Sequence, residues 1–405
     1  MRKLAWALLL IYCFAIPWEY SLDWGPPLGN VARLAGLLTL LVAIPVWFGE
    51  GRMRRPGAVV WLSLLFFLWI CCTCLWSVDP DTTSMHLRAW VQEMLPLWLI
   101  WELAESPEDL RDLLRATVAG SWVLALLTLA NLATIDAVAS EQIRFAAAGQ
   151  DPNDVARFLD LGFPLAVLLA ASERRWAARL LAWSYLPLGL VGVLLTASRG
   201  GFLTALVALA GSMVILLRRR PWAAAAGAMA LPVFVGLLWR IAPRATFERL
   251  ATIPEQLRGG DLNVRLNIWQ VGWQAYKNAP FFGHGMGAFT AAAHLLPTDT
   301  AHNTLLSLAV GGGMVAVLVA SVIVVVASAA VLHTRGTLRW TLGVGLLVWL
   351  LTSLVATVEE NRSSWLLLGL IALAGRLAAE QPRALAACFE SLRPESSEAL
   401  KRQAA

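Results

Sequence analysis

Long apolar runs recur along almost the whole of this sequence, and they constrain the fold more than any other feature. Of the 405 residues, 58% are hydrophobic and only 15% are charged, whereas a soluble domain has about 45–50% apolar and about 25% charged residues. A helix needs about 20 residues to cross the hydrocarbon layer of a membrane. We therefore predict an all-α polytopic membrane protein with about twelve transmembrane helices. The twelve runs begin near Leu4, Leu28, Ala58, Met85, Leu113, Val155, Ala177, Gly201, Trp222, Asn303, Leu338 and Ser363.

The basic residues predict the orientation of the chain, because cytoplasmic loops of membrane proteins are enriched in Lys and Arg. Both ends of the chain and every second connection together carry 20 of the 32 basic residues, and the other side carries 12. Both termini are therefore predicted to face the cytoplasm. The first apolar run is expected to be retained as a span, because no small-residue cleavage site follows it.

One connection on the predicted outer side is much longer than the others. It defines a large outer segment between the ninth and tenth spans. The chain is accordingly divided into residues 1–241 with transmembrane helices one to nine, 242–301 as the outer segment, 302–379 with transmembrane helices ten to twelve, and 380–405 as a polar cytoplasmic tail that is expected to be solvated.

Within the outer segment, residues 261–278 predict an amphipathic helix, because four residues recur at helical spacing on one face. Pro280 and the glycine-rich run 283–287 are expected to end it. The four residues are Arg265, Trp269, Gly272 and Tyr276.

Arginine is unexpectedly frequent on the predicted outer side. An arginine at the bilayer centre costs at least about 2.5–3.5 kcal/mol, so such residues lie near an interface or face a polar cavity. Extension of the side chain to lipid headgroups explains any one of them. Eleven arginines on one side favour an anionic ligand, and phosphate is the foremost candidate. The twelve basic residues of this side are Arg33, Arg88, Arg144, Arg157, Arg199, Arg240, Arg244, Arg249, Arg258, Arg265, Lys277 and Arg362.

Two short segments combine a structural role with a chemical one. Residues 149–154 predict a helix start, with Asp151 as N-cap and proline at the first helical position, but this does not explain Arg157 one turn further on. Residues 196–201 join two spans with almost no loop. Their glycines allow a tight reversal, and the same turn fixes Arg199 rigidly at the membrane surface; the two interpretations are equally supported.

His302 stands at the predicted start of the tenth span, next to Asn303. The positive end of a helix dipole disfavours a protonated imidazole, and a neutral imidazole can accept a proton as a general base. His284 and His294 are alternative candidates for that base. The sequence shows no metal-binding motif, and its five cysteines form no metal pattern, so we expect neither a metal nor another cofactor.

Five segments in this order resemble the O-antigen ligase superfamily, which also contains O-antigen polymerases and bacterial protein O-oligosaccharyltransferases. Each segment alone is weakly diagnostic, but their order, spacing and common outer placement are specific, and they span about the middle 160 residues. The segments are GQDPNDVA at 149–156, TASRGG at 196–201, RLNIW at 265–269, PFFGHGMGAF at 280–289 and AHNTL at 301–305.

The resemblance implies a metal-independent glycosyltransferase of the bacterial inner membrane with a periplasmic active site. Such a ligase moves a glycan from undecaprenyl pyrophosphate to the lipid A–core oligosaccharide. Arg199, Arg265 and His302 match residues considered functional in the family. We expect the two arginines to hold pyrophosphate and the histidine to take the proton of the acceptor, with inversion at the anomeric carbon. Further substrate-binding candidates are Arg157, Arg88, Arg362, Asp151, Asn153, Asn303 and Trp269.

Several alternatives stay open at this stage. A polymerase uses a second lipid-linked glycan as acceptor and a protein glycosyltransferase uses a Ser or Thr, and the donor motifs do not separate them from a ligase. The single long outer segment favours the ligase by analogy only. A lipid-linked glycan flippase or an anion transporter would show repeats with broken helices, and no such pairing is visible. Scattered basic residues argue against nucleic-acid binding.

Overall fold

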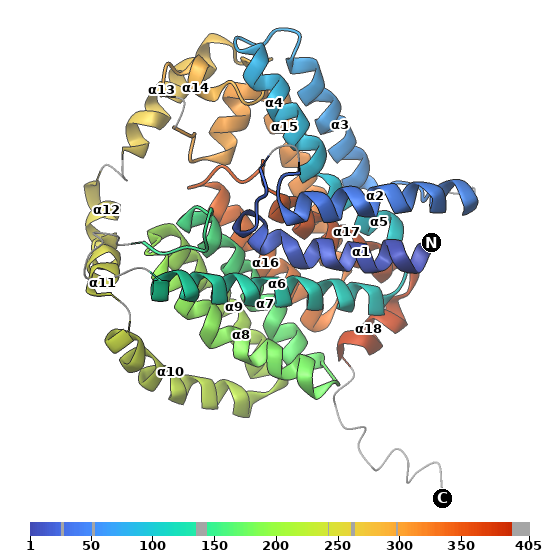
Figure 1. Ribbon diagram of the computed structural model, residues 1–405, viewed down its shortest axis with the longest axis vertical. Helices are drawn as coiled ribbons and strands as arrows, with labels where there is room; N and C mark the ends of the chain where they lie inside the picture. Colours follow the sequence, from blue (N-terminus) through green and yellow to red (C-terminus); the bar gives the residue numbers. More distant parts are fainter. Residues whose placement is uncertain are drawn as a thin grey trace, which may run out of the picture.

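The computed structural model describes the chain except for residues 26–27, 51–52, 135–143, 242, 261–263, 297–298 and 391–405. Within the described residues the protein is built from helices and contains no β-strand beyond one isolated bridge between Asp23 and Asn30. The all-α prediction is therefore confirmed for this part of the chain (Figure 1).

The helices follow one another closely along the chain. In order they are α1 (Arg2–Ala15), η1 (Ile16–Ser21), α2 (Val31–Glu50), α3 (Ala58–Thr73), α4 (Pro80–Glu93), α5 (Leu95–Leu103), α6 (Pro107–Thr134), α7 (Pro152–Ser172), α8 (Trp176–Leu195), α9 (Arg199–Arg219), α10 (Pro221–Ile241), α11 (Arg244–Ala251), α12 (Ile253–Gly259), α13 (Arg265–Asn278), α14 (Phe289–Ala292), α15 (Thr304–His333), α16 (Gly336–Ser353), α17 (Arg362–Glu380) and α18 (Pro382–Glu390).

Eight segments of the described chain are long and apolar enough to cross a membrane. Three further predicted spans are helices that fall outside these eight: α3 with 16 residues, α10 with 21 and α16 with 18. The structure therefore supports a multi-pass membrane protein, whereas the number twelve remains a prediction. The eight segments are Arg2–Ser21, Val31–Gly49, Pro107–Leu132, Pro152–Ser172, Trp176–Leu195, Arg199–Arg219, Thr304–His333 and Arg362–Glu380.

The predicted fourth span, starting near Met85, is two helices in the structure. The chain changes from α4 to α5 at Met94, and Pro96 stands at the start of α5. Proline has no N–H to donate and its ring clashes with the preceding turn, which accounts for the break between the two helices here. Neither α4, with 14 residues, nor α5, with 9, has the length of a span.

Helix α7 lies at the centre of the fold and is the framework for the site described below. It packs against α6, α8, α9 and α16, and its apolar window is fully buried. Glycine permits this close packing: a Cβ atom at Gly162 would lie 2.2 Å from the hydroxyl oxygen of Tyr185. That hydroxyl donates a hydrogen bond to the carbonyl of Leu159 at 2.6 Å.

Segments predicted to face the cytoplasm meet at one end of the helix bundle. Glu105 forms ion pairs with Arg2 at 2.5 Å and with Arg54 at 3.4 Å, and its carbonyl accepts a hydrogen bond from Gln381 at 2.9 Å. The N-terminus lies at this end, and α11, α12 and α13 lie on the opposite side of the molecule (Figure 1).

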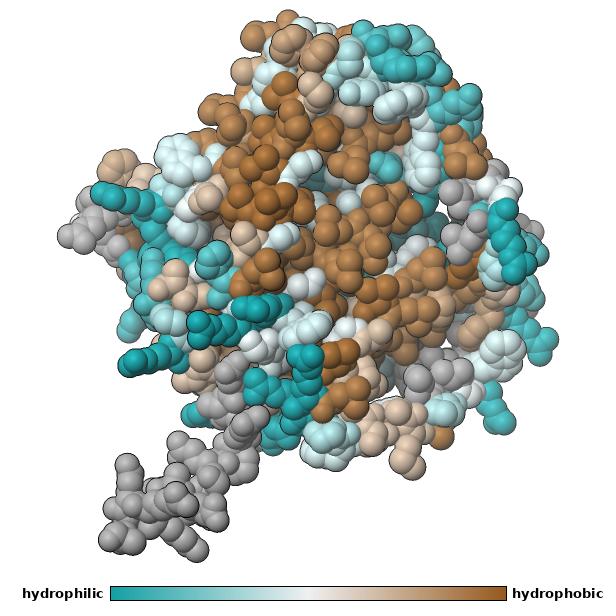
Figure 2. Space-filling model, turned by 180° about the vertical axis from the view of Figure 1, so that it is seen from behind, coloured by the Kyte–Doolittle hydropathy of each residue, from teal (hydrophilic) through white to brown (hydrophobic). Residues whose placement is uncertain are grey.

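The outer surface of the bundle is strongly apolar, as expected for a chain surrounded by lipid. Figure 2 shows a broad hydrophobic field with more hydrophilic residues toward its margins. On α15, Leu318, Val325 and Leu332 expose more than half of their surface.

The prediction of a solvated tail is wrong for residues 382–390. Residues 382–390 form α18, which packs against α6, α7, α16 and α17. Leu385, Cys388 and Phe389 are buried. Their spacing of three and four residues places them on one helix face, which is why this short segment docks. The remainder of the predicted tail lies outside the described residues.

The helix predicted for residues 261–278 is present as α13, which begins at Arg265 and ends at Asn278; residues 261–263 lie outside the described residues. Gly272 lets α13 pack closely against α14 and α15, since a Cβ atom there would lie 2.9 Å from the ring of Phe289 and 3.0 Å from Leu306. The helix therefore packs against the N-terminal end of α15.

A second glycine-rich contact fixes α15. This helix breaks at Gly313, where φ is 66°, and a Cβ atom there would lie 2.2 Å from the carbonyl oxygen of Phe281. The N–H groups of His284 and Gly285 donate to the carbonyls of Val310 and Gly311, both at 2.8 Å. The run of glycines after α13 thus docks into the break and joins the outer segment to the bundle.

Candidate functional site

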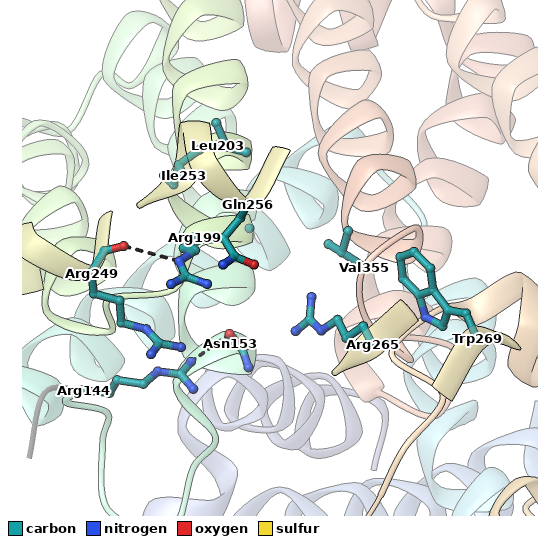
Figure 3. Close-up of a pocket in the computed structure, with 11 residues that line it drawn as sticks. Arg144, Asn153, Arg199, Leu203, Arg249, Ile253, Gln256, Arg265, Trp269 and Val355 are labelled. Atoms are coloured by element: carbon teal, nitrogen blue, oxygen red, sulfur yellow. Dashed lines mark hydrogen bonds between the residues drawn. The ribbon is translucent and has the colours of Figure 1, made fainter. Parts of the chain in front are cut away.

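Four arginines from separate parts of the chain line one pocket, called here the arginine pocket (Figure 3). Its cavity is about 130 Å³, and no acidic residue is among its lining residues. Figure 3 shows Arg144, Arg199 and Arg249 on one side and Arg265 approaching from the other. The lining residues are Arg144, Asn153, Arg199, Gly200, Leu203, Arg249, Ile253, Gln256, Arg265, Trp269 and Val355.

Three helices begin at this pocket. Asn153, Gly200 and Arg265 all line it, and each lies within the first two residues of its helix: α7, α9 and α13. The N-terminal end of a helix carries partial positive charge and unsatisfied N–H groups, so it favours bound anions. The backbone therefore adds to the positive potential of the arginine side chains.

The start of α7 matches the prediction from sequence. Asp151 caps the helix by accepting a hydrogen bond from the N–H of Asn153 at 2.7 Å, and Pro152 follows it. The side-chain oxygen of Asn153 accepts two further hydrogen bonds, from Nη2 of Arg144 and from the hydroxyl of Ser198, both at 2.8 Å. Asn153 therefore holds Arg144 and the start of α9 in fixed positions.

The turn at residues 196–201 is the tight reversal that its glycines predicted. Ser198 caps α9 by accepting a hydrogen bond from the N–H of Gly201 at 3.2 Å. A Cβ atom at Gly201 would lie 2.3 Å from the Cβ of Ala156, so glycine lets α9 start directly against α7. The tight reversal is confirmed, and it directs Arg199 into the pocket.

Hydrogen bonds to backbone carbonyls orient the other arginines. Nε of Arg199 donates to the carbonyl of Arg249 at 3.3 Å, and Nε of Arg249 donates to the carbonyl of Ala197 at 3.2 Å. Nε of Arg144 donates to the carbonyl of Thr196 at 3.2 Å. These bonds join the outer segment to the turn before α9.

The arginines lower one another's pKa. Burial is the largest cause for Arg144, Arg249 and Arg265, and the positive charge of neighbouring arginines lowers the pKa of each further. Asp151 partly opposes this effect at Arg144 and Arg265. All of these side chains stay charged near pH 7, so the pocket concentrates positive charge that a bound anion would neutralise.

The backbone is strained at three places around the pocket. Ala197, Val264 and His302 have φ angles of 47°, 67° and 46°, a region that residues other than glycine seldom adopt. Such conformations cost about 1–3 kcal/mol each and cluster at functional sites. Val264 immediately precedes Arg265, and Ala197 lies two residues before Arg199.

His302 is half-buried beside this site without lining the arginine pocket itself. Burial, followed by the positive charge of Arg265, lowers its pKa, so the imidazole is neutral near pH 7. The hydroxyl of Thr300 lies 3.2 Å from Nδ1 and 3.3 Å from Nε2. The indole N–H of Trp269 donates to the carbonyl of Ala301 at 3.0 Å, which ties the pocket wall to the histidine.

Other predicted residues have structural partners. Asn303 caps α15 by accepting a hydrogen bond from the N–H of Leu306 at 2.9 Å, and its amide nitrogen donates to the carbonyl of Leu354 at 3.1 Å. His284 lies 2.8 Å from the carbonyl oxygen of Ala275, within the contact between the glycine run and α15.

Two of the three arginines predicted as further substrate-binding residues, Arg88 and Arg362, lie outside the arginine pocket and the cavity beside it. Arg88 is exposed on α4, and Arg362 is buried in an ion pair with Glu19. His294 is exposed and lines neither the pocket nor its neighbouring cavity. Within the described residues, no group of three or more His, Cys, Asp and Glu side chains is arranged to hold a metal ion.

Arg144 and Arg249 are the two arginines of the pocket that the motifs did not identify. Both belong to the set of outer basic residues, but neither lies in a segment with a recognisable pattern. The hydrogen bonds of Arg144 to Asn153 and of Arg249 to Ala197 bring them to the site across 9 and 52 residues of sequence.

Among curated proteins no relative matches the chain. The family described as O-Antigen ligase matches residues 184–321, a range that contains Arg199, Arg249, Arg265 and His302. This match supports the assignment of the chain to the O-antigen ligase family.

Proposed function

We propose that this protein is an O-antigen ligase that transfers a glycan from undecaprenyl pyrophosphate to the lipid A–core oligosaccharide at the periplasmic face of the inner membrane. The observation that carries the proposal is the arginine pocket: four guanidinium groups and three helix N-termini meet around one cavity that no acidic side chain lines. A pyrophosphate group is the ligand that this arrangement suits best.

In the proposed reaction, the oxygen of an acceptor hydroxyl attacks the anomeric carbon of the donor sugar. The bond from that carbon to the pyrophosphate oxygen breaks, and its electron pair stays on the pyrophosphate. Arg199 and Arg265, together with Arg144 and Arg249, stabilise the charge that develops on the leaving group. The displacement occurs from the opposite side, so it inverts the anomeric centre.

His302 is the proposed general base. A base must be unprotonated at the working pH, and burial together with Arg265 lowers the pKa of this imidazole. Trp269 positions it through the hydrogen bond to Ala301, so we assign the tryptophan a positioning role as well as a place in the pocket wall. Arg88 and Arg362 have no part in the proposed mechanism.

The test compares two arginines of the outer segment in a transfer assay with purified undecaprenyl-pyrophosphate-linked glycan and lipid A–core. Arg265 lines the pocket, whereas Arg258 is exposed on α12. Arg265→Ala should reduce transfer at least about a hundredfold, since it removes charge-assisted contacts to the leaving group. Arg258→Ala should leave transfer unchanged.

Full activity of Arg265→Ala in membranes that contain normal amounts of the protein would refute the proposed site. The acceptor is tested separately by deleting the protein and examining lipopolysaccharide on a gel. Loss of the whole polymer ladder from the core, with lipid-linked polymer accumulating, indicates a ligase. A single-repeat band indicates a polymerase instead, and an unchanged ladder would refute both.

A further inference from the structure

Arg157 on α7 is a buried cation with few partners. Its side chain is 1% exposed, and none of its three guanidinium nitrogens makes a hydrogen bond within the described residues. Asp154 lies at an ion-pair distance of 3.1 Å from Nη2, but this carboxylate is itself 38% exposed. A buried charge without hydrogen bonds destabilises a fold strongly, so its presence here calls for a compensating ligand.

The guanidinium group lines a small cavity of about 30 Å³ directly beside the arginine pocket, called here the Arg157 cavity. Arg265 lines both spaces, and so do Asn153, Gly200 and Val355. The N-terminal end of α9 lies at the boundary between them, because Gly200 is its second residue. The two spaces are therefore neighbouring compartments of one site with a shared arginine.

Other polar side chains near Arg157 do not provide the missing hydrogen bonds. Asp160, one turn further along α7, is fully buried and accepts a hydrogen bond from the hydroxyl of Thr204, which itself lines the Arg157 cavity. The oxygen of Asn153 is occupied by Arg144 and Ser198. What the cavity offers a ligand is therefore mainly donor groups.

We propose that the Arg157 cavity is a second phosphoryl subsite, so that the site binds a diphosphate in preference to a monophosphate. One phosphoryl group lies in the arginine pocket, and an oxygen of the other reaches Arg157, with Arg265 contacting both. A diphosphate joins two phosphoryl groups through one bridging oxygen, and this matches two adjacent compartments that share one arginine. The inference rests on the proposed function and makes Arg157 the residue that selects a pyrophosphate-linked donor.

The test measures binding of inorganic pyrophosphate and of inorganic phosphate to the purified full-length protein by calorimetry, without any glycan transfer. Wild-type protein should bind pyrophosphate at least about tenfold more tightly than phosphate, the factor expected for one additional charge-assisted contact. Arg157→Met should abolish this preference and leave phosphate binding within about twofold. Arg249→Gln, which changes only the arginine pocket, should weaken binding of both anions.

Thermal unfolding separates this role from a structural one. Methionine matches the length of the arginine stem and removes a buried charge whose ion-pair partner, Asp154, is partly exposed, so Arg157→Met should unfold at the same temperature as the wild type or higher when no anion is present. Pyrophosphate should then raise the unfolding temperature of the wild type more than that of Arg157→Met, and phosphate should raise both by similar amounts. Arg157→Lys keeps the charge but not the forked donor geometry, and its preference for pyrophosphate should fall while the fold persists.

Each outcome bears on one of the two proposals. Equal binding of the two anions by the wild type, or an unchanged preference in both Arg157→Met and Arg157→Lys, would overturn the second subsite and leave the ligase proposal standing. A lower unfolding temperature of Arg157→Met with an unchanged preference would show that the arginine is structural. If the wild type bound neither anion, the proposed function itself would fail.

Discussion

Glu359 lies in the connection between α16 and α17, which contributes Val355 to the wall of the arginine pocket. The buried carboxyl of Glu359 allows a quantitative prediction of how stability depends on pH. The side chain is 4% exposed, and neither carboxyl oxygen has a hydrogen-bond partner within the described residues. The hydroxyls of Ser307 and Thr304 lower its pKa in part, although neither is in hydrogen-bonding geometry. Burial, followed by the charge of Glu360, raises this pKa from 4.5 to about 7.

The sign and size of the effect on stability follow from this shift. The folded protein holds the proton more tightly than the unfolded chain, so the protonated carboxyl contributes stability that is complete below pH 4.5 and is lost as the pH rises through about 7. Between those two pKa values the loss amounts to about 3 kcal/mol. Glu359→Gln mimics the protonated form and should avoid the loss.

The assay is thermal unfolding in detergent between pH 4.5 and 8.5. The unfolding temperature of Glu359→Gln relative to the wild type should increase with pH and level off above about pH 7.5. Glu255, which is exposed on α12, is the control, and Glu255→Gln should show no such increase. A difference between Glu359→Gln and wild type that stays constant with pH would refute the argument.

Three further predictions concern the site and its framework. The acid limb of the pH profile of kcat/KM should have its midpoint below pH 6.5, because burial and a nearby arginine lower the pKa of His302; a midpoint above 6.5 would argue against this base. Val264→Gly removes strain at a φ of 67°, and should raise the free energy of unfolding by about 1 kcal/mol; chemical denaturation measures it, and a decrease would contradict the strain. Gly201→Ala introduces a Cβ atom 2.3 Å from that of Ala156, and should lower stability by about 1–3 kcal/mol and reduce transfer. Gly227→Ala, with open space around it, should leave both nearly unchanged, and equal effects of the two glycine variants would rule out the proposed contact.

The local features of the fold were predictable because their causes are local. Asp151 and the proline after it specify a helix start, and the structure has that start. The break at Pro96 is also encoded locally, although hydropathy alone joined the two helices into one span. The break of α15 at Gly313 is different, because it depends on contact with Phe281 and the following glycines, more than 20 residues earlier.

The residues of the site also divide into those that a local sequence pattern predicts and those that depend on distant contacts. Arg199 and Arg265 each begin a helix next to a strained or capped residue, and such positions leave a pattern in the sequence. Arg249 enters the pocket only because its side chain bonds to the backbone before α9. Arg362 has a similar sequence setting but is paired with Glu19, 343 residues away. A partner at that separation determines whether an arginine is available to a ligand, and no local pattern shows it.

Features that weaken the fold are concentrated where the ligand is proposed to bind. Three of the four non-glycine residues with positive φ angles in the described chain lie around the pocket, four guanidinium groups repel one another, and Arg157 is buried without a hydrogen bond. The fully buried helix α7 gives the rigid support that such strained positions require. A ligand that binds only the folded state stabilises it. A bound anion would offset the repulsion among the arginines and the cost of burying Arg157, while the backbone strain would remain. The site is therefore preorganised for negative charge, because the packing of α7 and the hydrogen bonds of the arginines to backbone carbonyls hold these side chains together against their mutual repulsion.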